Sequence, residues 1–175
     1  MIVNLEKLKQ GRNEFQVEYG EKELDLTKVD FTLLGKVRAH LLFFKSRTNV
    51  KLSIELTYRL RMTCSRCLEE FERDFNEKST YYLKQGQEEY REEKHLTDED
   101  IFTLYYAVEE IDVTPLVREM VILSVPMKPL CREDCKGLCP VCGANLNYEN
   151  CGHTQEKVDP RLLKLKELKD LLGKS

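Results

Sequence analysis

VKLSIELTYRLRMT, residues 50–63, is the stretch of sequence that decides the fold. Apolar and polar residues alternate along it, and a period of two places successive side chains on opposite faces of a β-strand. One buried face and one solvated face are typical of an antiparallel sheet. The apolar face consists of Val50, Leu52, Ile54, Leu56, Tyr58 and Leu60, and the polar face of Lys51, Ser53, Glu55, Thr57, Arg59 and Arg61.

Strand patterns also occur on both sides of this stretch. FTLLGKVRAHLLFF precedes it across the break KSRTN, and LEEFERDFNEKSTYYL follows it after the bend CSRC. We therefore expect three long antiparallel strands between Phe31 and Leu83. The shorter pieces that we expect to contain strands are IVNLEKLK (2–9), NEFQVEYG (13–20) with KELDL (22–26), and IFTLYYAVEEIDV (101–113).

Two helices are predicted. In the first, residues 114–124, Thr114 can act as the cap, Pro115 suits the first helical position, and apolar residues recur at helical spacing. The second begins at Asp159 and Pro160 and carries a leucine stripe. The expected fold class is α+β: an antiparallel sheet, open or curled toward a barrel, covered by these two helices.

We expect two regions along the chain. Residues 1–125 form the sheet domain, which includes an acidic loop at residues 84–100 and the helix at residues 114–124. Residues 126–175 form a cysteine-rich, zinc-binding segment followed by a terminal helix docked on the sheet domain.

The net charge of −3 conceals two regions of opposite sign. Residues 35–73 contain nine basic and four acidic residues, whereas residues 84–113 contain three basic and ten acidic ones. The basic region includes the polar face of the central strand. Such a face can bind the phosphates of a nucleic acid, or it can simply be solvated.

Composition and targeting signals favour a globular cytoplasmic protein. Hydrophobic residues make up 41% and charged residues 34%. No apolar run reaches the roughly 20 residues of a membrane helix, and the first residues lack the apolar core of a signal peptide. We expect no membrane contact, and we expect the seven cysteines to remain reduced.

Five of the seven cysteines lie in PLCREDCKGLCPVCGANLNYENCGH, residues 129–153. Clustered thiolates in a reducing compartment favour a small tetrahedral ion, and zinc is the first candidate, as one structural ion. CPVCG has the form of a zinc knuckle, in which Gly143 lets the backbone turn so that amide N–H groups can point at sulfur. The spacing leaves open which residues complete that site: Cys131 with Cys135, Cys151 with His153, or Cys64 with Cys67.

No catalytic motif accompanies the cysteines, so we expect no enzymatic activity. The sequence has no phosphate-binding glycine loop, no nucleophile elbow and no HExxH. The pair Cys64 and Cys67 has the C-x2-C spacing of half a metal site, of a redox pair or of two packed cysteines. A zinc or thiol redox enzyme is therefore the least favoured alternative.

Several motifs together resemble the bacterial YceD family, named for large ribosomal RNA subunit accumulation. They are MTCSRCLEEF, IDVTPLVREMVILSVPMKPLC, CKGLCPVCGANLN and VDPRLLKLKEL, in that order after about residue 31. The resemblance implies a role in ribosome biogenesis, with large-subunit ribosomal RNA or a pre-ribosomal particle as partner. It also implies the zinc ligands, which are Cys131, Cys135, Cys139 and Cys142.

Some members of that family lack the later cysteines, which implies that zinc has a structural role and that the activity resides on the sheet. We therefore predict RNA binding by its basic face. The alternative is an adaptor that recruits a ribosomal protein or a processing factor through the acidic loop and the terminal helix. The predicted RNA-binding residues are Lys51, Arg59, Arg61, Arg66 and Lys136.

Overall fold

The computed structural model describes residues 1–175 except 28, 48, 87–100 and 154–175. The chain forms two compact units, Met1–Cys135 and Lys136–Ser175. The predicted terminal helix and nearly all of the predicted acidic loop lie outside the described residues.

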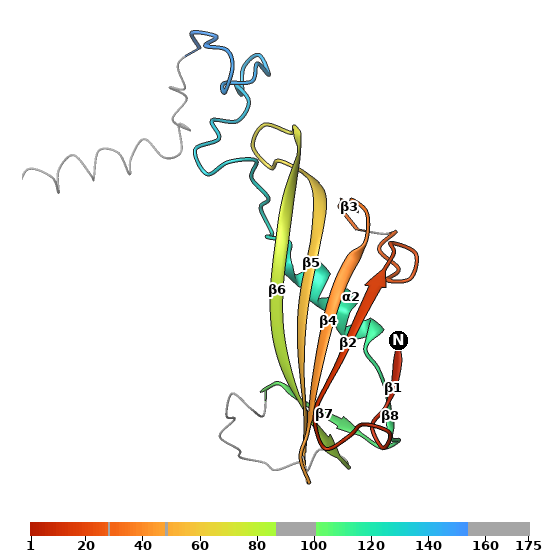
Figure 1. Ribbon diagram of the computed structural model, residues 1–175. Coiled ribbons are helices and arrows are strands. Elements are labelled where there is room, and N and C mark those ends of the chain that lie inside the picture. The colour runs from red at the N-terminus through yellow and green to blue at the C-terminus, as the bar shows by residue number, and fades with distance from the viewer. Residues whose placement is uncertain (28, 48, 87–100, 154–175) are drawn as a thin grey trace, which may run out of the picture. The chain divides into compact units, whose positions relative to one another are not determined.

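A six-stranded sheet forms the body of the first unit (Figure 1). Its main path runs β2-β4-β5-β6-β7, and every neighbouring pair is antiparallel except β6 with β7, which is parallel. The three long antiparallel strands expected between Phe31 and Leu83 are confirmed. The strands are β2 (Gly11–Tyr19), β3 (Phe31–Leu33), β4 (Val37–Lys45), β5 (Val50–Thr63), β6 (Glu70–Gln85) and β7 (Thr103–Tyr106).

The first of the three predicted strands is divided in two at Gly35, whose φ of +89° lies in the region that favours glycine. β5 is long enough to pair with β4 along most of its length and with β3 near its end. A separate two-stranded sheet joins β1 (Ile2–Asn4) to β8 (Glu110–Asp112). KELDL, predicted as part of a hairpin or edge strand, forms turns instead.

The buried face of the sheet packs against helix α2 (Thr114–Ser124), which crosses it in Figure 1. Val117 and Val121 of the helix are fully buried. The helix end is fixed by the hydroxyl of Tyr58 on β5, which donates a hydrogen bond to Ser124 Oγ at 2.6 Å. The predicted cap at Thr114 is wrong: Val113 is the N-cap, and the Thr114 hydroxyl donates to Asp112 Oδ1.

The predicted α+β class, with a sheet covered by helices and curled toward a barrel, is wrong. The described residues are mostly β, with α2 as their one α-helix, and β2 and β7 do not pair to close a barrel. Eleven helical residues span about 16 Å, whereas the fourteen of β5 span about 46 Å. The helix is too short to cover the sheet, and loop residues complete the core: Leu5, Leu8, Leu24 and Leu26.

Among the described residues, no helix has the length and apolar character needed to cross a membrane.

Candidate metal centres

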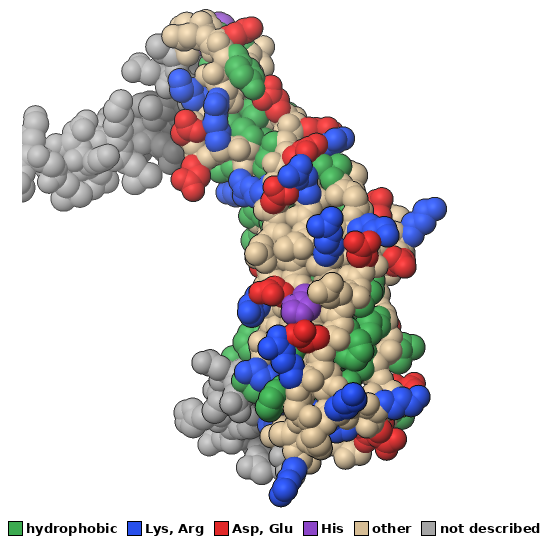
Figure 2. All heavy atoms as spheres, in the orientation of Figure 1, with side chains coloured by type: hydrophobic (Ala, Val, Ile, Leu, Met, Phe, Trp, Pro, Cys, Tyr) green, Lys and Arg blue, Asp and Glu red, His purple; other side chains and the backbone are tan. Residues whose placement is uncertain are grey.

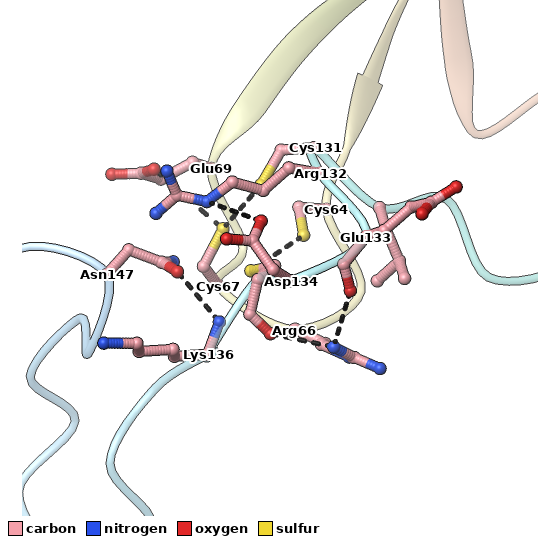
Figure 3. Close-up of polar contacts among 12 residues, drawn as sticks. Cys64, Arg66, Cys67, Glu69, Cys131, Arg132, Glu133, Asp134, Lys136 and Asn147 are labelled. Atoms are coloured by element: carbon pink, nitrogen blue, oxygen red, sulfur yellow. Dashed lines mark hydrogen bonds and ion pairs between the residues drawn. The ribbon is translucent and has the colours of Figure 1, made fainter.

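The first candidate centre, which we term the hairpin group, consists of Cys64, Cys67, Cys131 and Cys135. The four sulfur atoms all lie within 4.8 Å of one another. Cys64 Sγ is 3.8 Å from Cys135 Sγ, and Cys67 Sγ is 3.7 Å from Cys131 Sγ. In Figure 3 the sulfurs of the labelled cysteines converge between the β5–β6 turn and the segment that follows α2. Cys131 is half-buried and the other three are buried, so the group is largely shielded from water.

The β5–β6 turn supplies one half of the hairpin group because its backbone folds into a knuckle. The N–H of Cys64 donates to Glu69 O at 2.9 Å, and the N–H of Leu68 donates back to Cys64 O at 2.9 Å. Leu68 takes a φ of +61°, which an L-residue adopts at a steric cost. This conformation turns the chain tightly enough for Cys64 and Cys67 to face the same point.

Two arginines hold the other half of the hairpin group in place. The Arg66 guanidinium donates to Cys135 O at 2.8 Å and to Glu133 O at 3.3 Å (Figure 3). The Arg73 guanidinium donates to Leu130 O at 3.0 Å. The backbone also contributes, because the Ser65 N–H donates to Pro129 O at 2.8 Å. Thus the segment carrying Cys131 and Cys135 is tied to the hairpin on both sides.

The thiols of the hairpin group differ in acidity. Burial raises the pKa of Cys64, but the N–H groups of Cys131, Cys67 and Arg66 outweigh it and lower that pKa to about 6. Burial, together with hydrogen bonds to the neighbouring thiols, raises the pKa of Cys131 to about 12. Amide N–H groups directed at sulfur stabilise a thiolate, which is the form that binds a metal.

The second candidate centre, which we term the loop group, consists of Cys139, Cys142, Cys151 and His153. Their four donor atoms also lie within 4.8 Å of one another, and Cys139 Sγ is 3.9 Å from His153 Nδ1. Cys139 is buried, but Cys142 and His153 are exposed and Cys151 is half-buried. This group is therefore far more open to water than the hairpin group.

The loop group is built on the predicted knuckle CPVCG. The N–H of Cys139 donates to Ala144 O at 2.8 Å, and the N–H of Gly143 donates to Cys139 O at 2.8 Å. Gly143 has a φ of +75°, as expected for its role in the knuckle. The N–H groups of Cys142 and Val141 lower the pKa of Cys139 to about 6.

The structure divides the four ligands that the resemblance implies for one zinc. Cys131 and Cys135 belong to the hairpin group, whereas Cys139 and Cys142 belong to the loop group. The predicted alternates complete both groups, since Cys64 and Cys67 join the first pair and Cys151 and His153 join the second. Local spacing does not reveal the first pairing because it depends on where the β5–β6 turn meets the chain after α2.

The predicted RNA-binding residues are differently placed. Arg59 forms a two-pronged ion pair with Asp74, with nitrogen–oxygen distances of 2.7 and 2.9 Å. Arg61 pairs with Glu72 at 3.0 Å. Lys51 lies over the Tyr82 ring, with Nζ 5.5 Å from the ring centroid.

The remaining two predicted residues belong to the cysteine segments. Arg66 holds the hairpin group, as described above. Lys136 begins the second unit, where its backbone N–H donates to Asn147 Oδ1 at 2.8 Å. Acidic partners on β6 and main-chain carbonyls thus engage three of the five: Arg59, Arg61 and Arg66.

Fold and site together define a mainly β protein that carries two knuckle-based groups of potential metal ligands. The chain belongs to the family described as large ribosomal RNA subunit accumulation protein YceD, whose family model matches residues 52–169. This match covers more than half of the chain and confirms the resemblance seen in the motifs. It includes every cysteine of the two groups.

Named relatives match shorter parts of the chain. An uncharacterized protein of Mycobacterium tuberculosis (strain ATCC 25618 / H37Rv) is 47% identical over 60 residues, which is 34% of this chain and 28% of that protein. Large ribosomal RNA subunit accumulation protein YCED homolog 1, chloroplastic, of Arabidopsis thaliana is 40% identical over 52 residues, or 30% of this chain and 16% of that protein. The matched part thus spans less than a third of either relative. No solved structure matches this chain.

Proposed function

We propose that this protein is a non-enzymatic factor that supports the accumulation of large-subunit ribosomal RNA. The observation that carries the proposal is the family match over residues 52–169. Plant relatives named for the same accumulation role also match parts of the chain. This role would place the protein in a compartment that contains ribosomes, which is the cytoplasm in a bacterium.

The geometry of the cysteine groups supports a role other than catalysis. Each group brings four protein donors together, enough to fill the four positions of a tetrahedral ion. A catalytic zinc needs an open position for water or substrate. The cysteine groups are better suited to holding the fold, so we assign the activity to the exposed face of the sheet.

That face is not uniformly basic. Figure 2 shows Lys and Arg side chains interspersed with Asp and Glu. Near the hairpin group, Arg59 and Arg61 are matched by Asp74 and Glu72 on β6. Cations already paired with carboxylates gain less from a phosphate, because the carboxylate competes for the same guanidinium.

The opposite end of the same face combines cations with aromatic rings. The strand registers place Arg12, Phe44, Lys51 and Tyr82 in one row across four strands. The next outward-facing pair toward the sheet edge is Lys84 with Tyr105. Phe44 is 55% and Tyr105 37% exposed, so both rings are accessible.

Exposed rings beside lysines are suited to single-stranded RNA. Bases stack on aromatic side chains, at about 1–3 kcal/mol per base, while lysines attract the phosphates. Of the predicted RNA-binding residues, Lys51 lies in this row. We therefore propose that the surface formed by Phe44, Lys51, Tyr82, Lys84 and Tyr105, which we term the aromatic row, binds an unpaired segment of large-subunit RNA.

The test is binding of the full chain to large-subunit ribosomal RNA fragments over a range of salt concentrations. We expect affinity to fall with salt, and we expect Phe44→Ala with Tyr105→Ala to weaken binding at least tenfold. Arg59→Ala with Arg61→Ala is the matched control on the same face, with a change of less than threefold. Both double variants should keep the wild-type circular dichroism spectrum.

The results separate the parts of this proposal. Absence of binding at low salt excludes direct RNA binding. Binding that the control variant abolishes and the aromatic variant retains moves the site to the ion-paired end of the face.

The adaptor function remains as a second candidate because the segment around β7 exposes apolar side chains. Ile101, Phe102 and Val108 are 62%, 46% and 70% exposed. Nearly all of the acidic loop and the whole terminal helix predicted for this role lie outside the described residues. A protein partner that co-purifies with the chain after nuclease treatment, and is lost on Val108→Asp, would favour the adaptor.

A further inference from the structure

We propose that the chain binds two zinc ions independently, one in the hairpin group and one in the loop group. The two groups together contain all seven cysteines of the chain. An odd number of cysteines is accounted for because one group has four thiols and the other has three with a histidine. No thiol remains outside the two centres.

The spacing of the sulfur atoms matches a tetrahedral ion. Zinc–sulfur bonds of about 2.3 Å place the corners of a tetrahedron about 3.8 Å apart. The sulfur of Cys64 is 3.8 Å from that of Cys135, and the sulfur of Cys67 is 3.7 Å from that of Cys131. A disulfide needs a separation of about 2.05 Å, so these pairs are spaced for a shared ion.

The two knuckles have the same hydrogen-bond pattern. In each, the first cysteine N–H donates to the carbonyl five residues ahead, and the N–H four residues ahead donates back to that cysteine. In each, the residue after the second cysteine has a positive φ, +61° at Leu68 and +75° at Gly143. The shared pattern makes CSRCL the backbone equivalent of CPVCG, although it lacks the glycine.

The charge of each occupied centre agrees with its surroundings. Zinc with four thiolates carries a net charge of −2, whereas zinc with three thiolates and a neutral histidine carries −1. The more negative centre is the buried one, and there Arg66 donates to the carbonyl of a ligand, Cys135. Arg73 donates to the carbonyl that precedes Cys131. A cation near a buried anionic centre offsets part of its desolvation cost.

The donor types favour zinc in both groups. Thiolate-rich tetrahedral sites select zinc or iron, and the imidazole of His153 suits zinc in the loop group. The hairpin group, with four thiolates, has the donor set of structural zinc sites whose positions are all filled by protein. Each group thus provides a closed centre without using a donor from the other.

The test is the metal content of the full chain, measured by native mass spectrometry and by elemental analysis. We expect two zinc ions per chain. Cys67→Ser and Cys151→Ser should each reduce the content to one, and the double variant should reduce it to none. Ser65→Ala is the matched control in the same turn. It should retain two zinc ions, because Ser65 bonds to Pro129 through its backbone N–H, which alanine keeps.

Two further measurements keep the proposal testable if Cys67→Ser does not fold. Cys67→His keeps a metal donor and should retain two zinc ions. In the wild-type protein, all seven thiols should resist alkylation until a chelator is added. One zinc that Cys67→Ser and Cys151→Ser both leave in place would instead establish a single site built from Cys131, Cys135, Cys139 and Cys142. Protection of only the four hairpin-group thiols would show that the loop group holds no metal, and would also overturn the proposal. Iron in place of zinc, or no metal, would also overturn the proposal.

Discussion

The hairpin group and the loop group show one knuckle used in two settings. The hairpin group joins residues that are distant in sequence, since Cys64 and Cys135 are 71 positions apart. The loop group is local, with Cys139 and His153 separated by 14 positions. The first is mostly buried, whereas two of the four ligands of the second, Cys142 and His153, are exposed. The difference shows that the same local geometry can tie a fold together or organise a short loop.

The energetic consequences differ with the length of chain that each group closes. The entropic cost of closing a loop grows with the logarithm of its length. Closing 71 rather than 14 residues costs about 1.4 kcal/mol more. A metal that holds the longer loop shut removes this cost from folding, so the hairpin group should contribute more to the stability of the sheet.

Cys64→Ser compared with Cys142→Ser gives the largest expected difference. With zinc at a thousand times its Kd, loss of the hairpin-group ion should lower the free energy of unfolding of the sheet by about 4 kcal/mol. Cys142 belongs to the other compact unit. Its replacement should change that free energy by less than about 0.5 kcal/mol, because the loop group shares no ligand with the hairpin group. Urea unfolding followed by circular dichroism measures both.

Equal losses in the two variants would contradict the division of roles. The division of roles would also be contradicted if the wild-type sheet unfolded at the same urea concentration with and without a chelator. Ser65→Ala serves as the control here, because it keeps the backbone hydrogen bond of the turn.

The sequence predicts the strands well because their signal is local. Alternation from Val50 to Met62 specifies a buried face, and the structure buries every second residue of β5. The covering of that face is not a local property. Leu5, Leu8, Leu24 and Leu26 lie in segments without helical periodicity, yet they fill the core beside α2. The predicted fold class is wrong because these loop residues, and not a second helix, cover the rest of the buried face.

The candidate sites divide in the same way. CPVCG is recognisable from its glycine, and the structure gives it the expected knuckle. CSRCL has the same hydrogen bonds, but its left-handed position is occupied by Leu68. Without a glycine there, the sequence does not indicate the knuckle. The sequence of one strand also does not show which cations have acidic neighbours, whereas the register places Asp74 and Glu72 directly opposite Arg59 and Arg61. Cross-strand pairing therefore decides which cations are available to a ligand.

Removing one supporting side chain from each group gives a smaller effect. Arg66→Ala removes the hydrogen bonds to Cys135 O and Glu133 O, and Asn147→Ala removes the acceptor for the Lys136 N–H. Each change should cost about 1 kcal/mol, or roughly fivefold in zinc affinity, at its own centre alone. Competition with a chromophoric chelator, in the background of Cys151→Ser or Cys67→Ser respectively, measures each centre separately. An effect of Arg66→Ala on the loop group would contradict their independence.

Replacing the residue at the left-handed position of each knuckle gives the smallest effect, and the two changes should have opposite signs. Leu68→Gly relieves a φ of +61° at a side chain that is 64% exposed, so little packing is lost. The left-handed conformation costs an L-residue about 1–2 kcal/mol, and glycine removes this strain. Part of the stabilisation is offset because glycine raises the conformational entropy of the unfolded chain. We expect a net stabilisation of the hairpin group of about 0.5–1 kcal/mol. Gly143→Ala imposes the same strain at a φ of +75°, and zinc retention by the loop group should weaken by a similar amount. If Leu68→Gly instead weakens zinc retention by the hairpin group, Leu68 contributes contacts there, and the two knuckles are not equivalent.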